Sequence, residues 1–331
     1  MKQLSEAKQF IIHTLNDGLC HSGSELGTSL GMSRTAIWKH IKQLIELGIP
    51  IQQLPKQGYL LKTPFFMLDA TAINDNLASI GFNDEAQLHV FSSIDSTNRY
   101  LKSLPSSNSL NVCVAELQTN GRGRFNRSWY SPFAENIYCS TKWQISCDLA
   151  QLSGLSLVVS LASRSALEAF VPIDDILVKW PNDLMCNHKK LSGTLIEIQV
   201  ESNGLIDIII GIGLNVNSVP HEHPELDKAW CSMKEVSGNT INRNQVIAAL
   251  IKSLDKNLKQ FFSQGLPSFT EEWCAVDYLF NQAITVKEPS GDIHGTAVGI
   301  NDCGLLLVKD QQGVTHAVSS GDTSVKREVR N

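Results

Sequence analysis

The chain has 331 residues, with a hydrophobic fraction of 42% and a charged fraction of 18%, as expected of a soluble globular protein with two or three domains. No run of about 18 apolar residues and no apolar signal-peptide core occur, so we expect a cytoplasmic protein without a membrane partner. The net charge of −5 is divided unevenly, because residues 1–62 carry +3 and the rest of the chain carries −8.

The amino-terminal segment predicts three short helices and a hairpin. Apolar residues at helical spacing indicate a helix over residues 5–16, and a second helix ends at Gly31. A third helix begins at Ser33, whose side chain can cap it, and ends before Gly48. Residues 49–61 alternate weakly around a turn and predict a small β-hairpin. These are the elements of a winged helix-turn-helix domain.

Polar side chains gather on the predicted third helix, opposite an apolar face formed by Ile37, Ile41 and Leu44. The candidates for DNA contact are Ser33, Arg34, Thr35, Trp38, Lys39 and Lys42. A helix-turn-helix domain places such a face in the major groove, and the local charge of +3 favours contact with phosphates. The alternative is that the lysines are only solvated surface charges. Tight binding by so small a domain would require a dimer on a two-fold operator.

The middle of the chain predicts a mixed α and β domain. Strands are expected at 89–92, 112–117, 137–143, 176–180, 191–200 and 205–212, with a hairpin turn at 201–204 between the last two. Helices are expected at 95–103, 151–170, 244–263 and 267–278.

The end of the chain predicts short strands at 284–286, 296–300, 305–308 and 314–318, separated by turn residues. This rhythm is typical of a small β-barrel. The residues Lys62–Pro64 are interpreted as the linker after the first domain. The eight cysteines are scattered and form no C-x-x-C pair, so we expect reduced, mostly buried thiols.

The strongest chemical signal is the loop Gly121–Trp129, which reads Gly-Arg-Gly-Arg-Phe-Asn-Arg-Ser-Trp. Its two glycines let the backbone approach an anion and change conformation. The three arginines of the loop offer paired donors to phosphate or carboxylate groups, and Trp129 can lie against a ligand ring. The alternative is a basic surface loop with a core tryptophan.

Two lysines and a carboxamide–carboxylate pair lie close together in Lys179–Asp183 and Lys190–Gly193. Two lysines can neutralise a carboxylate and a phosphate that meet in one pocket, and Asp183 can hold Mg²⁺. If this stretch stood alone, an ordinary hairpin with solvated charges would be the better interpretation.

Two further patterns are weaker. The residues Asp95–Asn98 stand where a strand gives way to a helix, so their side chains either cap that helix or bind a small polar ligand. The segment Gly211–Asn215 contains a glycine pair that carries little information by itself.

Together, these residues resemble one family, the bifunctional biotin protein ligases known as biotin operon repressors. The resemblance rests on Asp95–Asn98, Gln118, Gly121–Arg124, Trp129, Lys179–Asp183, Lys190–Gly193 and Gly211–Asn215. Their order and spacing match the family throughout the central domain. The helix-turn-helix and the small barrel match as well, so the resemblance covers essentially the whole chain.

The resemblance implies an α+β multidomain protein. Residues 1–63 would form the winged helix-turn-helix, residues 66–275 a catalytic mixed sheet with helices similar to class II aminoacyl-tRNA synthetases, and residues 277–331 an SH3-like small β-barrel. Such a protein forms biotinoyl-5′-AMP from biotin and ATP with Mg²⁺, and transfers biotin to a lysine of the biotin carboxyl carrier protein of acetyl-CoA carboxylase. The resemblance also implies a homodimer, promoted by the adenylate, that binds operator DNA and represses biotin biosynthesis genes.

The same resemblance implies roles for individual residues. The implied catalytic residues are Arg124, Lys179 and Lys190. The implied biotin-binding residues are Ser96, Thr97, Asn98, Gln118, Arg122, Gly123, Arg124, Lys190 and Gly193. The implied ATP-binding residues are Arg124, Trp129, Lys179, Asn182, Asp183 and Asn215, of which Asp183 is also the implied Mg²⁺ ligand.

The loop departs from the family pattern G-R-G-R-R-G-R-x-W, because Phe125 and Asn126 replace an arginine and a glycine. Arg124 remains, so ligation is expected, whereas the loop should be stiffer and less basic. Near the end of the chain, Lys326 stands where the family leads us to expect an arginine close to the nucleotide.

Three other functions compete with this interpretation. One is a ligase that no longer represses, the second is a lipoate–protein ligase with the same adenylation chemistry, and the third is a non-enzymatic biotin sensor. The DNA-binding domain and the Gly121–Arg124 motif argue against a lipoate ligase. Retention of the three implied catalytic residues argues against a sensor.

Overall fold

The computed structural model describes residues 4–61, 65–107, 109–200, 204–220, 229–288, 291–320 and 324–327. The linker expected at Lys62–Pro64 and most of the hairpin turn expected at 201–204 lie outside these residues, and the side chain of Lys326 is not among those described. Within the described part of the chain, no helix combines the length and the hydropathy that crossing a membrane requires.

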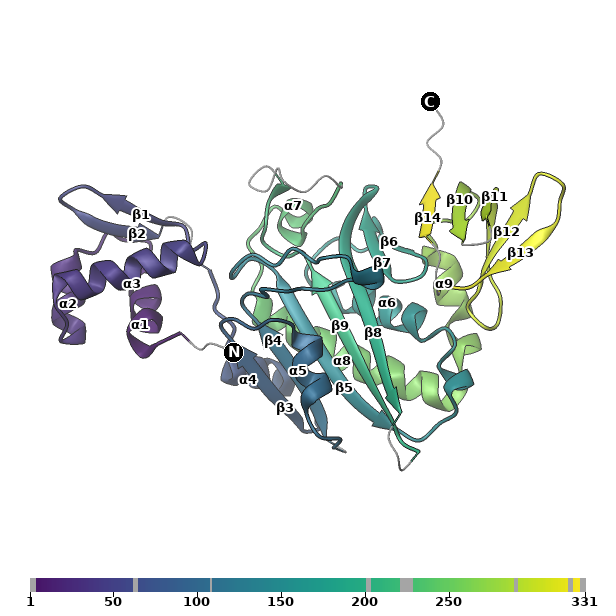
Figure 1. The fold of residues 1–331 in the computed structure, drawn as a ribbon, viewed down its shortest axis with the longest axis horizontal. Coiled ribbons are helices and arrows are strands. Elements are labelled where there is room, and N and C mark those ends of the chain that lie inside the picture. Colours follow the sequence, from purple (N-terminus) through teal and green to yellow (C-terminus); the bar gives the residue numbers. More distant parts are fainter. Residues whose placement is uncertain are drawn as a thin grey trace.

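The amino-terminal domain is a winged helix-turn-helix, as the sequence predicts, and it stands beside the central sheet (Figure 1). Its elements are α1 (Glu6–Leu15), α2 (Gly23–Leu30), α3 (Arg34–Glu46), β1 (Ile51–Leu54) and β2 (Gly58–Leu61). The Ser22 side chain and Glu25 form a capping box at the start of α2, and Gly31 ends that helix in the left-handed conformation. The Ser33 hydroxyl accepts a hydrogen bond from the Ala36 backbone and caps α3.

The central domain is built on a seven-stranded sheet in the order β3-β4-β5-β9-β8-β7-β6, antiparallel except for the pair β3 and β4. The strands are β3 (Ala86–Phe91), β4 (Leu110–Ala115), β5 (Ile137–Ile145), β6 (Ile176–Lys179), β7 (Asp183–Cys186), β8 (Lys189–Val200) and β9 (Ile206–Leu214). The helices are α4 (Ala70–Ser79), α5 (Thr97–Ser103), α6 (Leu155–Ala166), α7 (Met233–Ser237), α8 (Arg243–Gln264) and α9 (Thr270–Val276). The mixed sheet with helices agrees with the predicted fold class.

Helices cover both faces of this sheet. Helices α6 and α8 pack together across one face, and the short α5 lies on the other (Figure 1). Strand β9 therefore reads as a nearly continuous apolar run, since side chains alternate between two covered faces. Ile208 and Ile210 belong to the large core beneath α6 and α8, whereas Ile209 packs with Leu101 of α5. Beyond Ile209, the α5 face of β9 continues with glycines, and there the sheet is not covered by core side chains.

The first two domains share a packed boundary. Phe133 and Ala134 of the central domain belong to the same buried cluster as the core of the helix-turn-helix. The Asn16 side chain bonds both backbone polar groups of Phe65 at 2.9 Å. Next to this contact, Arg243 donates to the Phe66 carbonyl and forms a buried ion pair with Glu116 at 2.7 Å. The two domains are therefore joined through side-chain packing as well as through the chain.

The carboxy-terminal domain is a five-stranded antiparallel sheet in the order β13-β12-β11-β10-β14. Its strands are β10 (Ala283–Glu288), β11 (Gly291–Ile300), β12 (Leu306–Asp310), β13 (Thr315–Val318) and β14 (Ser324–Arg327). The sequence predicts the first four of these and misses β14. Buried residues such as Ile284 and Leu306 belong to the same core cluster as α6 and α8.

Two predicted helices are shorter than expected. The helix expected at 151–170 is a 3₁₀ turn at Leu149–Leu152 followed by α6, because Gly154 adopts a left-handed conformation between them. The helix expected at 267–278 is likewise divided into a 3₁₀ turn at Leu266–Phe269 and α9. All eight cysteines are free thiols, and four of them are buried, among which Cys139 has its pKa raised by burial to about 12.

Candidate active site

A cavity of about 870 Å³ opens where the α5 face of the sheet is free of core side chains. Its walls come from the start of α5, the loop after β4, the turn between β6 and β7, and strands β8 and β9. Every ligand-contact residue expected from the sequence lines it: Ser96, Thr97, Asn98, Gln118, Arg122, Gly123, Arg124, Trp129, Lys179, Asn182, Asp183, Lys190, Gly193 and Asn215. Folding thus brings motifs that are far apart in sequence into one pocket.

Glycines form the floor of the cavity. A Cβ atom at Gly213 would collide with the ring of Trp129, and one at Gly211 would collide with the carboxamide of Asn98. A Cβ atom at Gly193 would lie 2.9 Å from the Lys190 ammonium nitrogen and 3.2 Å from the Trp129 ring. The glycine pair of β9 is therefore required because polar and aromatic side chains lie flat against the strand.

A chain of hydrogen bonds connects the polar residues at the start of α5 with the loop. The Thr97 backbone donates to Gln118 Oε1 at 2.9 Å, and Gln118 donates to Ser131. Ser140 Oγ, buried on β5, lies 2.7 Å from Thr97 Oγ1 and 2.6 Å from Asn98 Oδ1. Ser96 occupies the N-cap position of α5, but its side chain makes no capping hydrogen bond. Helix capping therefore does not account for these side chains, which form one buried polar wall.

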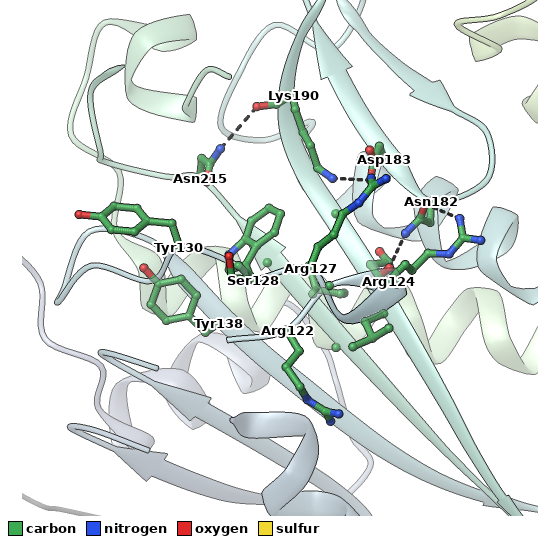
Figure 2. Close-up of a pocket in the computed structure, with 18 of the residues that line it drawn as sticks. Arg122, Arg124, Arg127, Ser128, Tyr130, Tyr138, Asn182, Asp183, Lys190 and Asn215 are labelled. Carbon is green, nitrogen blue, oxygen red and sulfur yellow. Dashed lines mark hydrogen bonds and ion pairs between the residues drawn. The ribbon is translucent and has the colours of Figure 1, made fainter. Parts of the chain in front are cut away.

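Cationic groups gather in another part of the same cavity. Lys190 Nζ lies 2.7 Å from Asp183 Oδ1 and 5.4 Å from the centroid of the Trp129 ring. Arg124 donates to Asn182 Oδ1 at 3.4 Å and to the Ser320 carbonyl of the carboxy-terminal domain. Figure 2 shows Lys190 directed to Asp183 and Arg124 directed to Asn182, whereas Arg122 points away from both. Such a wall can hold two anions next to each other.

Burial affects the charge of this wall. Desolvation lowers the pKa of the Arg124 guanidinium from its ordinary value, and the nearby Asp183 carboxylate opposes that change. An arginine stays protonated at neutral pH despite such a change, so Arg124 remains a cation in the pocket.

The loop between Gly121 and Trp129 is folded on itself. The Trp129 backbone donates to the Gly121 carbonyl at 2.9 Å, and Gly123 donates to the Arg127 carbonyl at 2.7 Å. Both residues that depart from the family pattern have positive φ, 57° at Phe125 and 55° at Asn126. The Phe125 ring lies 4.9 Å from the Arg124 guanidinium carbon and 5.7 Å from that of Arg127, distances that suit cation–π attraction.

Several residues around the pocket are not singled out by sequence patterns. Tyr138 of β5 and Trp230 line the cavity, and Ser140 and Glu197 support its polar wall from just outside. The alternation of β5 and β8 could have suggested the faces on which Ser140 and Glu197 lie, but it does not indicate what they contact. One conspicuous motif residue has a structural role: Trp180 is buried and donates to the Gly304 carbonyl at 3.0 Å, which ties the turn to the carboxy-terminal domain.

The residues expected to contact DNA lie apart from the cavity, on α3. Ser33, Arg34, Thr35, Trp38, Lys39 and Lys42 are all exposed. Trp38 is 44% exposed, and Lys42 lies above its ring at 5.8 Å while pairing with Glu46 at 3.9 Å. Because Ile37, Ile41 and Leu44 are fully buried, the polar residues share the outward face of the helix.

Three family models match successive parts of the chain. A helix-turn-helix domain model matches residues 8–60, the biotin/lipoate A/B protein ligase family matches residues 90–215, and the biotin protein ligase carboxy-terminal domain matches residues 279–326. The matches occur in the order of the three structural units.

Similar proteins match over nearly the full length. The bifunctional ligase/repressor BirA of Salmonella typhimurium is 36% identical over 317 residues, which are 96% of each chain. The protein of the same name from Bacillus subtilis is 30% identical and covers 90% of this chain and 92% of its own. Among solved structures, the biotin protein ligase of Aquifex aeolicus in complex with biotin and ATP has a TM-score of 0.62 at 29% identity. It covers 73% of this chain and 99% of its own.

Proposed function

The chain belongs to the family of bifunctional biotin ligase/repressors, and from that premise we propose how its pocket activates and transfers biotin. The protein converts biotin and ATP to biotinoyl-5′-AMP and pyrophosphate, and then passes biotin to a lysine of the biotin carboxyl carrier protein of acetyl-CoA carboxylase. The observation that carries the assignment is the pocket itself, in which neutral polar side chains and cationic side chains line one cavity.

In the first step, a biotin carboxylate oxygen attacks the α-phosphorus of ATP and pyrophosphate leaves. Two anions must approach each other, and their repulsion raises the barrier unless fixed cations offset it. We assign Lys190 to the biotin carboxylate, Lys179 to the carboxylate or the α-phosphate, and Arg124 to the phosphate. The ion pair of Lys190 with Asp183 supports this assignment, because a carboxylate already occupies the position next to the ammonium group.

We assign recognition of the biotin and adenine rings to the polar wall and to Trp129 with its neighbour Asn215. Ser96, Thr97, Asn98 and Gln118 would bind the biotin ring system, while Trp129 and Asn215 would lie near adenine. The Trp129 indole nitrogen is buried without a hydrogen-bond partner among the described residues, which is consistent with a donor reserved for a ligand.

The Asp183 carboxylate is a suitable ligand for Mg²⁺ in this site. The described residues contain no group of three or more His, Cys, Asp or Glu side chains placed to hold a metal ion. Mg²⁺ is commonly held by one or two carboxylates together with substrate phosphates, so Asp183 alone is a sufficient protein ligand. The ion would neutralise phosphate charge when ATP is bound.

In the second step, the neutral amine of the acceptor lysine attacks the acyl carbon of the mixed anhydride, and AMP leaves. No enzyme nucleophile takes part. Because water would also attack the anhydride, the Gly121–Trp129 loop is assigned the role of excluding it. A lipoate ligase would perform the same chemistry on a different substrate, and competition distinguishes the two. Because we assign the pocket to biotin, added lipoate should leave the rate of biotin transfer unchanged.

Substituting Gly213 with alanine is expected to raise the KM for ATP by about tenfold or more, in line with the cost of overpacking a close contact. The new methyl group would displace the Trp129 ring, which lies against this glycine. The measurement is pyrophosphate release against ATP concentration. In a Trp129→Ala background the same substitution should add little, whereas an unchanged KM in the single variant would contradict the placement of Trp129 beside the nucleotide.

The protein is also a repressor, and we propose that the adenylate-bound homodimer is the form that binds the operator of biotin biosynthesis genes. Replacing Lys39 with alanine should weaken operator binding. It should also reduce the slope of log K against log salt concentration by about 1, the value for loss of one phosphate contact. Fluorescence anisotropy with labelled operator DNA, biotin and ATP measures both quantities. Lys309→Ala, an exposed lysine of β12, is the matched control. Operator binding that does not strengthen with biotin and ATP would contradict the corepressor mechanism.

A further inference from the structure

Glu197 lies just behind the cavity and contacts two of its walls. It projects from β8 with a side chain that is 18% exposed. Its Oε2 atom accepts a hydrogen bond from Asn98 Nδ2 at 3.0 Å and lies 3.0 Å from Arg122 Nη2. Its Oε1 atom lies 3.6 Å from Lys102 Nζ. One carboxylate therefore joins the polar wall to the base of the loop.

The first contact fixes the orientation of a carboxamide. Asn98 Oδ1 faces Ser140 Oγ at 2.6 Å, while Asn98 Nδ2 donates to Glu197 and lies 3.3 Å from the Leu195 carbonyl. Two acceptors therefore surround the amide nitrogen, and turning the amide over would bring its oxygen against both of them. The carboxylate of Glu197 thus dictates which atom of Asn98 faces each neighbour.

The second contact anchors the loop. Arg122 pairs through its backbone with Ser128 across the base of the loop, and its guanidinium turns away from Arg124 and Lys190 (Figure 2). Glu197 is the carboxylate to which that guanidinium is bonded. The hydrogen bond from Asn98 and the charges of Arg122 and Lys102 outweigh desolvation and hold the pKa of Glu197 below its ordinary value. The carboxylate is therefore an anion at neutral pH and a strong partner for both groups.

We propose that Glu197 is a positioning residue for biotin recognition, which fixes the Asn98 carboxamide for the biotin ring system and, through Arg122, holds the base of the ligand loop against the same strand. This inference rests on the proposed function of the pocket. Glu197 itself does not line the cavity, so its effect on biotin passes through Asn98 and Arg122. Loss of its charge should disturb biotin binding more than ATP binding, because Glu197 bonds Asn98 directly, whereas Arg124 and Trp129 keep their own contacts with Asn182 and Lys190.

The test is Glu197→Gln, which preserves size but removes the charge, in the full-length enzyme. The KM for biotin in pyrophosphate release should rise about tenfold, as for loss of a charge-assisted hydrogen bond. The KM for ATP and the rate of transfer from preformed biotinoyl-5′-AMP should change less than about twofold, and the Tm should stay close to that of wild type. Glu235→Gln, which breaks the exposed pair with Lys189, is the matched control and should change none of these values.

A double substitution separates positioning from a purely structural role. Because Glu197 acts in part through Arg122, Arg122→Gln in the Glu197→Gln background should raise the KM for biotin much less than it does alone. Unchanged biotin KM in Glu197→Gln would overturn the inference, as would equal losses for biotin and ATP accompanied by a lower Tm. Wild-type protein that releases no pyrophosphate with biotin would instead overturn the proposed function, and binding of labelled biotin alone would still test Glu197.

Discussion

Replacing Lys190 with alanine is expected to slow formation of biotinoyl-5′-AMP by about two to three orders of magnitude, the usual cost of removing one preorganised charged or donor group from an active site. The ammonium group is held on β8 by its pair with Asp183 and by the Trp129 ring, so its position is fixed before substrate arrives. Without it, the biotin carboxylate meets the α-phosphate with less of its charge offset. Single-turnover release of pyrophosphate measures the step directly.

The neighbouring residue provides the control. Lys189 has the same charge, but its side chain is 42% exposed and pairs with Glu235 outside the cavity. Lys189→Ala should form the adenylate at the wild-type rate. If the two variants lose activity to a similar extent, general electrostatic attraction of ATP explains the effect, and the specific role of Lys190 is wrong.

Replacing Arg243 with methionine is expected to destabilise the protein by about 3–5 kcal/mol, the range for breaking a buried ion pair by removing one partner. Arg243 and Glu116 are 0% and 2% exposed, and Arg243 also donates to the carbonyls of Asn136 and Phe66. Methionine fills much of the same space but leaves the Glu116 carboxylate buried, with the Leu68 backbone amide as its remaining donor among the described residues. Denaturant unfolding of the full chain, followed by circular dichroism, measures the loss.

An exposed ion pair gives the comparison for this experiment. Lys259 pairs with Asp84 and Asp255, and its side chain is 61% exposed. Lys259→Met should change stability by no more than about 1 kcal/mol, since solvent screens such pairs. A similar small change in Arg243→Met would show that the boundary between the first two domains does not depend on the buried pair.

Residues that line the pocket can be predicted from the sequence where they lie together in contiguous motifs. Loop glycines, paired lysines and the segment at the start of α5 can be recognised because each carries several unusual residues in a short span. Glu197 and Ser140 could not be found in this way, since each is a single polar residue in a strand whose neighbours are ordinary. Their roles depend on the pairing of β5, β8 and β9, which brings together residues far apart in the chain.

The secondary structure likewise divides into elements that local sequence patterns predict and elements that they do not. Predicted strands and caps in the helix-turn-helix agree with the structure to within a few residues, because strong apolar periodicity and Ser caps determine them locally. The sequence patterns did not predict α4, a helix of 10 residues with only two buried residues, Ile73 and Leu77. They did not predict β7 either, because this four-residue strand is bounded by the Trp180–Pro181 turn and by the tight turn at Asn187 and His188. Both elements are stabilised by tertiary packing, which local sequence patterns do not predict.

The most direct test of the proposed ligase activity is transfer of labelled biotin to a purified carrier domain by the wild-type protein with ATP and Mg²⁺. We predict label on one carrier lysine, with one AMP and one pyrophosphate formed for each biotin transferred, and no label when ATP is omitted. A protein that binds biotin tightly but leaves the carrier unlabelled would contradict the ligase activity. The same pocket would then belong to a biotin-sensing repressor without ligase activity.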